Sequence, residues 1–291
     1  MIPHRTAILV AFLIWVALLG TGCRGNTVVQ SAVAEDAAPT ATPTVAATPT
    51  PSPEPTELPT EPPVNQTVTP VRFGYVVVEE FEHDPGAFTQ GLVFVDGMFY
   101  EGTGGRGQST LRRVDPATGE VLQGIRYPEQ YFAEGVAVLD DRIFQLTWQS
   151  QTGFILDRET FELEGQFTYP TEGWGLTHDG ERLIMSDGTP SLYFLDPATQ
   201  NIIGQITVQD DQGPVAMLNE LEYIDGQIYA NIWQTEQIAI IDPASGNVTA
   251  YIDLRGLPDD DARAKLIGLH DLVDEQALAC LLYTSDAADD L

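Results

Sequence analysis

The 291-residue sequence predicts an all-β fold made of repeated units, because two short motifs recur along it at nearly the same interval. The first motif places a polar or aromatic residue at the head of an apolar stretch, and its copies are Gln90-Gly91, Glu134-Gly135, Trp174-Gly175 and Asn219-Glu220. Counted from Gly91, these copies start 44, 40 and 45 residues apart. A period of about 40–45 residues with several short strands per unit is typical of the blades of a β-propeller.

The second motif is a turn that begins with aspartate and keeps the same spacing. Its copies lie at residues 115–119, 157–160, 196–199 and 242–246. Asp can cap such a turn through its side chain, Pro presets φ, and Gly supplies the positive φ that ends it. Because the four turns recur at the same interval as the first motif, we interpret them as structural elements of the repeats.

The repeats are expected to follow one another without helices between them. The first runs from Phe88 to about Pro128, with strands near 91–95, 98–103, 110–114 and 121–127, and the later ones cover 132–170, 174–208 and 218–254. Short hairpin turns are predicted at 96–97, 140–141 and 225–226. A strand over 75–81 is assigned to completing the last blade, and a short helix is expected over 258–266.

The N-terminal region predicts export. An apolar run over 7–19 is shorter than the roughly 20 residues of a membrane-spanning helix, and it precedes Gly20-Thr21-Gly22-Cys23. This arrangement is similar to a bacterial lipoprotein signal over 1–23, with Cys23 as the lipidated residue; ordinary secretion and a retained anchor are the alternatives. Residues 24–70, rich in Pro, Thr and Ala, are expected to form a disordered tether. We therefore expect an extracytoplasmic protein held at the membrane by a lipid, or else a secreted one.

The C-terminal region breaks the repeat pattern. No fifth unit follows residue 273, so the propeller over 71–279 is expected to be incomplete, with about four complete blades and a truncated fifth. Residues 280–291 resemble the translated sequence of a library-preparation adapter, and we interpret them as a non-native tail.

Charge and residue spacing exclude several functions. With 43 acidic and 13 basic residues and a net charge of −30, the chain would repel a phosphate backbone, so no nucleic-acid partner is expected. His83, His178 and His270 lack the spacing of metal ligands, and no phosphate-binding loop or nucleophile elbow is present, so we expect neither metal nor cofactor. We also expect a monomer.

The four copies of the first motif, read with their flanking residues at 88–92, 132–135, 172–176 and 218–223, resemble the plant-type and bacterial glutaminyl-peptide cyclotransferase family. The resemblance covers roughly 73–272. It implies a five-bladed propeller that converts N-terminal glutamine of peptides or proteins to pyroglutamate with release of ammonia. It also implies that Glu134 is catalytic and that the substrate pocket contains Phe88, Gln90, Trp148, Trp174, Asn219 and Trp233.

Two positions depart from the family pattern. Ala133 stands where the second motif has Gly, and the lysine that the family carries late in its fifth blade has no counterpart in this sequence. The missing lysine puts the activity of the chain as written in question.

The expected chemistry is an intramolecular cyclisation. The α-amine attacks the side-chain amide carbon of the same residue, so the protein must orient the two groups and move a proton. A carboxyl at Glu134 in an apolar, aromatic site is suited to carry that proton, because burial raises its pKa. Indole N–H groups of Trp148, Trp174 and Trp233 are expected to donate to the substrate's amide oxygen, and Gln90 and Asn219 to orient its backbone carbonyl and amine. We interpret Glu101, Glu172, Glu220 and Asp187 as structural, or as residues that support the site without touching the substrate.

Two other functions remain open on the sequence alone. A non-catalytic propeller could use the same aromatic pocket to bind peptides or glycans at the cell surface, and a purely structural surface scaffold is the third alternative. Turnover of a peptide with N-terminal glutamine separates the first function from the other two.

Overall fold

The computed structural model describes the chain in several stretches, which all belong to one compact unit: 8–10, 69–75, 77–79, 81, 83–255 and 267–269. For 8–10, 77–79 and 267–269 only the backbone is described. Cys23, the predicted tether up to residue 68, the predicted helix over 258–266 and the tail over 280–291 lie outside the described residues, so these assignments stay predictions. Within the described stretches no helix has the length and apolar character needed to cross a membrane.

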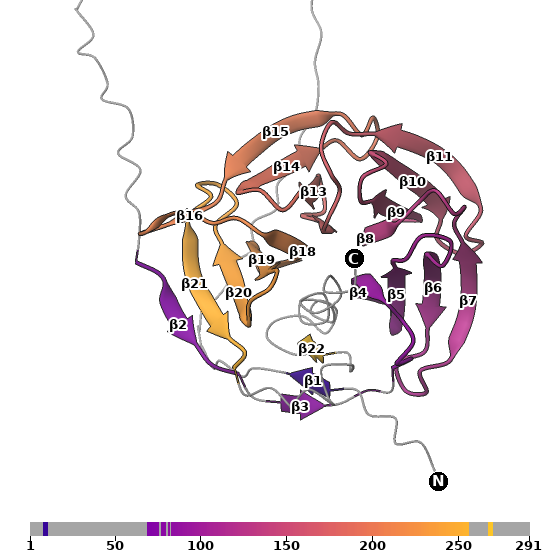
Figure 1. The fold of residues 1–291 in the computed structure, drawn as a ribbon, viewed down its shortest axis with the longest axis horizontal. Helices are drawn as coiled ribbons and strands as arrows, with labels where there is room; N and C mark the ends of the chain where they lie inside the picture. Colours follow the sequence, from indigo (N-terminus) through magenta and orange to yellow (C-terminus); the bar gives the residue numbers. More distant parts are fainter. Residues whose placement is uncertain are drawn as a thin grey trace, which may run out of the picture. The chain divides into compact units, whose positions relative to one another are not determined.

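Four antiparallel sheets, one for each repeat, make up most of the described chain (Figure 1). The first sheet contains β4 (Thr89–Val95), β5 (Met98–Thr103), β6 (Thr110–Val114) and β7 (Val121–Arg126). The second contains β8 (Ala133–Leu139), β9 (Arg142–Thr147), β10 (Thr152–Asp157) and β11 (Leu163–Thr168). The third contains β12 (Leu176–His178), β13 (Leu183–Ser186), β14 (Ser191–Leu195) and β15 (Ile202–Thr207). The fourth contains β18 (Leu218–Ile224), β19 (Gln227–Ile232), β20 (Gln237–Ile241) and β21 (Val248–Asp253).

The sheets are arranged radially, as the sequence predicts for propeller blades. Their first strands lie next to one another in the order β4, β8, β12 and β18, and in the first three sheets the last strand lies outermost (Figure 1). The prediction of an all-β, propeller-like fold is therefore confirmed for four sheets.

Glycine at the head of an inner strand allows the sheets to approach closely. A β-carbon on Gly91 would lie 2.6 Å from the backbone nitrogen of Val136 in the next sheet, and one on Gly135 would lie 2.5 Å from the backbone nitrogen of Leu176. A β-carbon on Gly175 would likewise meet the backbone of Asn219 and Glu220. The repeated glycine of the first motif is thus required by backbone contact between blades.

Each pair of neighbouring sheets encloses its own apolar core. Leu111 of the first sheet packs with Val136 and Ile143 of the second, and Leu146 of the second packs with Leu176 and Leu183 of the third. The interface between the third and fourth sheets has the same character, with Ile184, Leu192, Phe194, Leu218, Leu221 and Ile228. Burial of one such aliphatic side chain contributes about 1.5–3 kcal/mol, so these interfaces hold the blades together.

Short strands complete the described structure. β2 (Val71–Phe73) pairs parallel with β21 and so extends the fourth sheet. β1 (Ile8–Val10), β3 (Val77–Glu79) and β22 (Ile267–Leu269) form a separate sheet in the order β22-β1-β3, and β16 (Gln209–Asp210) pairs with β17 (Gly213–Pro214). The strand predicted over 75–81 is thus shorter than expected, and the strand that extends the fourth sheet comes from the residues before it.

The turns of the second motif form as predicted. The Asp115 carboxylate accepts a hydrogen bond from the backbone N–H of Ala117 at 2.8 Å, and Asp242 does the same for Ala244 at 2.8 Å. Gly119 and Gly246 have positive φ, whereas in the second and third repeats Phe161 and Gln200 adopt the left-handed conformation instead. The hairpin at Asp96-Gly97 has positive φ at both residues, as a type I′ turn requires.

Candidate active site

Irregular pairing at the heads of three inner strands positions the predicted site residues. The register shifts between Thr89 and Gly91 in β4, between Ala133 and Val136 in β8, and between Leu218 and Leu221 in β18. These β-bulges contain Gln90, Glu134 and Asn219 respectively. A bulge bends its strand and re-aims a side chain, which is a common device beside active sites. In the third sheet Trp174 lies just before β12 instead.

Glu134 is a buried acid at the head of β8. It is 7 % exposed, and its backbone carbonyl accepts a hydrogen bond from the side chain of Gln145. Within the described residues its carboxyl accepts no hydrogen bond. Burial raises the pKa of the Glu134 carboxyl well above its usual value, and the negative charge of Glu172 raises it further. Because none of the described residues stabilises the anion, the protonated form is favoured over a wider pH range than in an exposed glutamate.

Aromatic side chains from all four sheets surround this region in two groups. The Phe132 ring contacts Phe88 edge-on, with ring centroids 5.8 Å apart, and Trp148, with centroids 5.7 Å apart. The Trp174 and Trp233 rings also meet edge-on, at 5.5 Å. Edge-to-face pairs at these distances are favourable arrangements of aromatic rings, so each group is held as a unit.

Glu172 joins the two aromatic groups. One oxygen of its carboxylate, Oε2, accepts hydrogen bonds from the indole Nε1 of Trp148 at 2.7 Å and of Trp174 at 3.0 Å. The prediction that these two N–H groups point toward a substrate oxygen is therefore wrong for this structure, because a neighbouring carboxylate is their acceptor. The sequence interpretation of Glu172 as a residue that supports the site agrees with these contacts, because Glu172 links the two tryptophans and its charge acts on Glu134.

Gln90 and Asn219 are at least as buried as Glu134. Gln90 is 7 % and Asn219 5 % exposed. A β-carbon on Gly104 would meet the Phe132 ring and Gln90 Cγ, which places Gln90 beside the first aromatic group. The backbone carbonyl of Asn219 accepts a hydrogen bond from Ser186 Oγ at 2.6 Å. The roles of Gln90 and Asn219 in orienting a substrate stay predictions.

Glu220 occupies the place of the repeated glycine in the fourth sheet. Its side chain is almost wholly buried and lies close to the backbone N–H of Leu92 in the first sheet, which opposes the rise in its pKa. Burial raises the pKa of Glu220 well above its usual value, and the charges of Glu222 and Glu134 add to the effect. Within the described residues its Oε2 has no hydrogen-bond partner.

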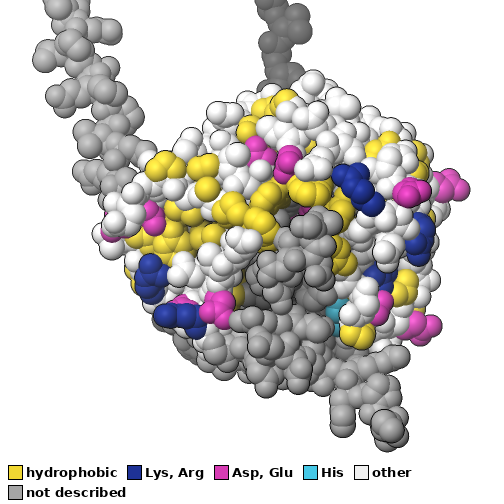
Figure 2. Space-filling model, viewed as in Figure 1, with side chains coloured by type: hydrophobic (Ala, Val, Ile, Leu, Met, Phe, Trp, Pro, Cys, Tyr) yellow, Lys and Arg dark blue, Asp and Glu magenta, His cyan; other side chains and the backbone are white. Residues whose placement is uncertain are grey.

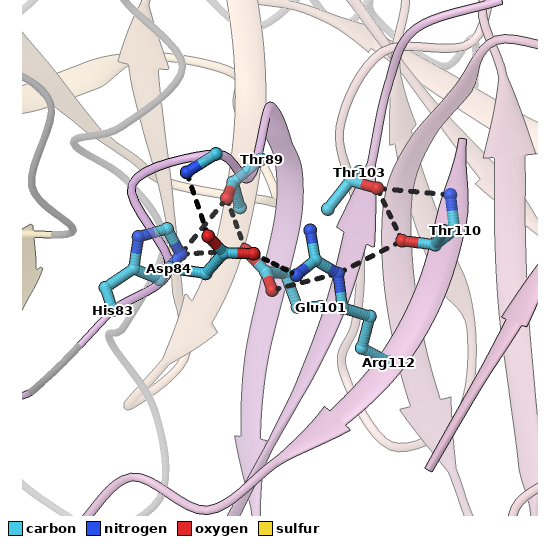
Figure 3. A network of polar contacts seen from close by, with 8 residues as sticks. His83, Asp84, Thr89, Glu101, Thr103, Thr110 and Arg112 are labelled. Atoms are coloured by element: carbon cyan, nitrogen blue, oxygen red, sulfur yellow. Dashed lines mark hydrogen bonds and ion pairs between the residues drawn. The ribbon is translucent and has the colours of Figure 1, made fainter. Parts of the chain in front are cut away.

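A polar network supports the segment that carries Phe88 and Gln90 (Figure 3). Buried Glu101 accepts hydrogen bonds from Thr89 Oγ1 and from His83 Nε2, the latter at 2.8 Å. Arg112 adds ion pairs to Asp84 at 2.8 Å and to Glu101 at 3.7 Å. The network thus joins the chain before the first repeat to β5 and β6, and it fixes the position of Thr89 next to Gln90.

The face drawn in Figure 2 has hydrophobic side chains gathered in a band over the fourth sheet and toward the inner strands.

No set of three His, Cys, Asp or Glu side chains in the described stretches is grouped to hold a metal ion. The structure adds Phe132 and Glu172 to the site. Phe132 lies two residues before Glu134 in the sequence, and Glu172 lies two residues before Trp174, so closeness to the predicted residues is the sequence feature that could have identified them.

Known proteins show the same combination of sequence and fold. Residues 53–269 match the family model described as glutamine cyclotransferase. The chain is 41 % identical over 183 residues to the glutaminyl-peptide cyclotransferase of Arabidopsis thaliana, and the match covers 62 % of this chain and 57 % of the plant protein. The chain therefore spans little more than half the length of that relative.

A solved structure is similar over most of the described residues. It is the glutaminyl cyclase of Myxococcus xanthus, with 31 % sequence identity and a TM-score of 0.64, covering 74 % of this chain and 95 % of the bacterial one. The family model spans well over half of the sequence, and the four-sheet arrangement agrees with this structural likeness. This chain therefore belongs to the glutamine cyclotransferase family.

Proposed function

We propose that this protein converts the N-terminal glutamine of peptides to pyroglutamate and releases ammonia, with Glu134 as the proton carrier. The observation that carries the proposal is the environment of Glu134: it is 7 % exposed, its carboxyl has no hydrogen-bond donor within the described residues, and it lies beside a cluster of half-buried tryptophans. The chain's membership of the glutamine cyclotransferase family and the names of its relatives support the same activity.

In the proposed reaction the substrate's neutral α-amine attacks the carbon of its own side-chain amide. A carbon–nitrogen bond forms to the amine nitrogen, and the bond to the amide nitrogen breaks. Protonated Glu134 gives its proton to the departing nitrogen, which leaves as ammonia, and takes up the proton that the attacking amine loses. Such general acid–base catalysis is worth about 10²–10⁴-fold in rate.

The remaining site residues are proposed to hold the substrate in this geometry. Phe88, Trp148, Trp174 and Trp233 wall the glutamine side chain, whereas Gln90 and Asn219 offer amide groups to the peptide backbone. Because nucleophile and leaving group belong to one residue, correct orientation supplies a large part of the rate enhancement.

We further propose that the active ring has five blades, as the resemblance implies, with the fifth built outside residues 83–255. An extracytoplasmic location, a lipid anchor at Cys23 and a monomeric state remain proposals too. Metabolic labelling with a radioactive fatty acid, compared between the native chain and Cys23→Ala, tests the anchor.

The activity is tested by measuring ammonia release from a dipeptide with N-terminal glutamine. We expect release well above the spontaneous rate and its loss in Glu134→Gln, a substitution of nearly the same size that cannot carry a proton. Glu164→Gln, the same change at an exposed residue of β11, should keep full activity. Saturable binding of peptides without any turnover would instead favour the non-catalytic propeller.

A further inference from the structure

Glu172 uses only half of its capacity to accept hydrogen bonds. Both indole N–H groups bind the same oxygen, Oε2, at 2.7 and 3.0 Å, and within the described residues the side chain makes no other hydrogen bond. The second oxygen, Oε1, therefore remains available as an acceptor. Unlike Glu134, Glu172 is only partly buried.

The two tryptophans fix the direction of that available oxygen. Trp148 is held by its edge-on contact with Phe132, and Trp174 by its edge-on contact with Trp233. A carboxylate held from both sides by rigid, packed donors cannot turn freely, so Oε1 is preorganised.

The surroundings of Oε1 suit an amino group. A carboxylate whose neighbours are aromatic side chains offers a hydrogen-bond acceptor in an otherwise apolar setting, as small-molecule sites commonly do. Glu172 is also close enough to Glu134 for its charge to act on that carboxyl. An amine bound at Glu172 would thus lie near the proposed proton carrier.

We propose that Oε1 of Glu172 accepts a hydrogen bond from the substrate's α-amino group and so selects peptides with a free primary amine at the N-terminus. This inference rests on the proposed cyclotransferase function. The amine donates one N–H to Oε1, which orients its lone pair for attack, and no covalent bond is made or broken at Glu172. An N-acylated peptide lacks this basic amine and is excluded.

The substitution Glu172→Gln separates this role from a structural one. The amide oxygen of Gln can still accept both indole N–H groups, while its NH₂ group replaces Oε1 and turns an acceptor into a donor. We expect KM for a Gln dipeptide to rise about tenfold to a hundredfold, the usual effect of losing a hydrogen bond to a charged group, with a smaller change in kcat. Trp148→Phe removes one indole donor and leaves Oε1 in place, so its KM should rise less. Unchanged KM in Glu172→Gln would overturn the inference.

Binding measurements distinguish failure of this inference from failure of the proposed function. A dipeptide with N-terminal norleucine has the amine but no reactive amide, and its hexanoyl analogue lacks the amine; both can be titrated by tryptophan fluorescence without turnover. Wild type should bind the norleucine peptide about tenfold more tightly or better, and Glu172→Gln should bind the two peptides equally. A preference for the amine that persists in Glu172→Gln contradicts the role of Glu172 even if the enzyme is active. Absence of ammonia release from wild type contradicts only the cyclotransferase activity.

Discussion

The charge of Glu172 acts on the carboxyl of Glu134: burial raises the pKa of Glu134 well above its usual value, and Glu172 raises it further. One of these acids is held by two indole N–H groups, and the other has no donor in the described structure. Two neighbouring carboxyl groups in such different environments are suited to different tasks, one to accept hydrogen bonds and one to carry a proton.

This relationship predicts the pH dependence of kcat/KM. Activity should rise as the substrate amine, with an ordinary pKa of about 7.7–8.0, loses its proton, and fall as Glu134 loses its own. In Glu172→Gln the neighbouring negative charge is gone, so the pKa of Glu134 decreases and the alkaline limb moves to lower pH. Profiles of wild type, Glu172→Gln and the control Glu164→Gln measure this shift. Coincident alkaline limbs in all three would contradict it.

Glu222 should destabilise the fold at alkaline pH. Burial raises the pKa of its carboxyl to about 8, above an unfolded value of about 4.3. Between these values the folded state binds the proton more tightly, so stability falls as pH rises through this window. Glu222→Gln resembles the protonated acid and should be more stable than wild type at pH 8, on the order of a few kcal/mol, but not at pH 4. Urea unfolding at both pH values tests this, and equal differences at the two would count against it.

Glu101 should have the opposite dependence on pH. Burial alone would raise its pKa, but the hydrogen bond from His83 and the charges of His83 and Arg112 outweigh burial and lower it. Its contribution is therefore complete above the unfolded pKa and is lost as pH falls through the folded pKa. Glu101→Gln leaves Arg112 without part of its charge compensation and should cost about 3 kcal/mol at pH 7, with a smaller loss in acid. Thermal unfolding at the two pH values is the measurement, and a loss that does not depend on pH argues against this electrostatic origin.

Gly135→Ala should separate two blades. The added methyl group would lie 2.5 Å from the backbone of Trp174 and Leu176, which cannot move as a flexible side chain can. We expect a loss of about 3 kcal/mol, the upper end for overpacking. Gly165→Ala is the matched control, because its methyl group would meet only Ile155 Cδ1 at an ordinary 3.7 Å. A similar stability for both variants would show that the close approach of the sheets is not limiting.

The parts of the fold that depend on local chemistry could be predicted from the sequence. β5 and β6 have the predicted bounds: the Asp96-Gly97 turn fixes the start of β5, and the Asp115-Pro116 turn fixes the end of β6. The four sheets follow from the repeat period. By contrast, the bulge at Glu134 arises from pairing between β8 and β9, and no residue pattern marks which position is extra.

The site was predictable in composition but not in contacts. Glu134 and Trp174 share one region because equivalent positions of successive repeats meet near the centre. The hydrogen bonds of Trp148 and Trp174 to Glu172 could not be foreseen, because they depend on side-chain directions across two sheets. The same limit applies to Glu220, which contacts Leu92 at the opposite end of the repeat region.

The row of glycines at Gly91, Gly135 and Gly175 also restricts how such a protein can change over generations. The inner strands of neighbouring sheets touch through their peptide groups at these glycines. If a whole sheet were duplicated or lost, the distance between neighbouring sheets would stay the same only if the inner strand of each sheet retained its glycine. The fourth unit has Glu220 at this position. If it exchanged places with any of the other three, a carboxyl group would press against an adjacent backbone, so the order of the units is inherited as a single arrangement.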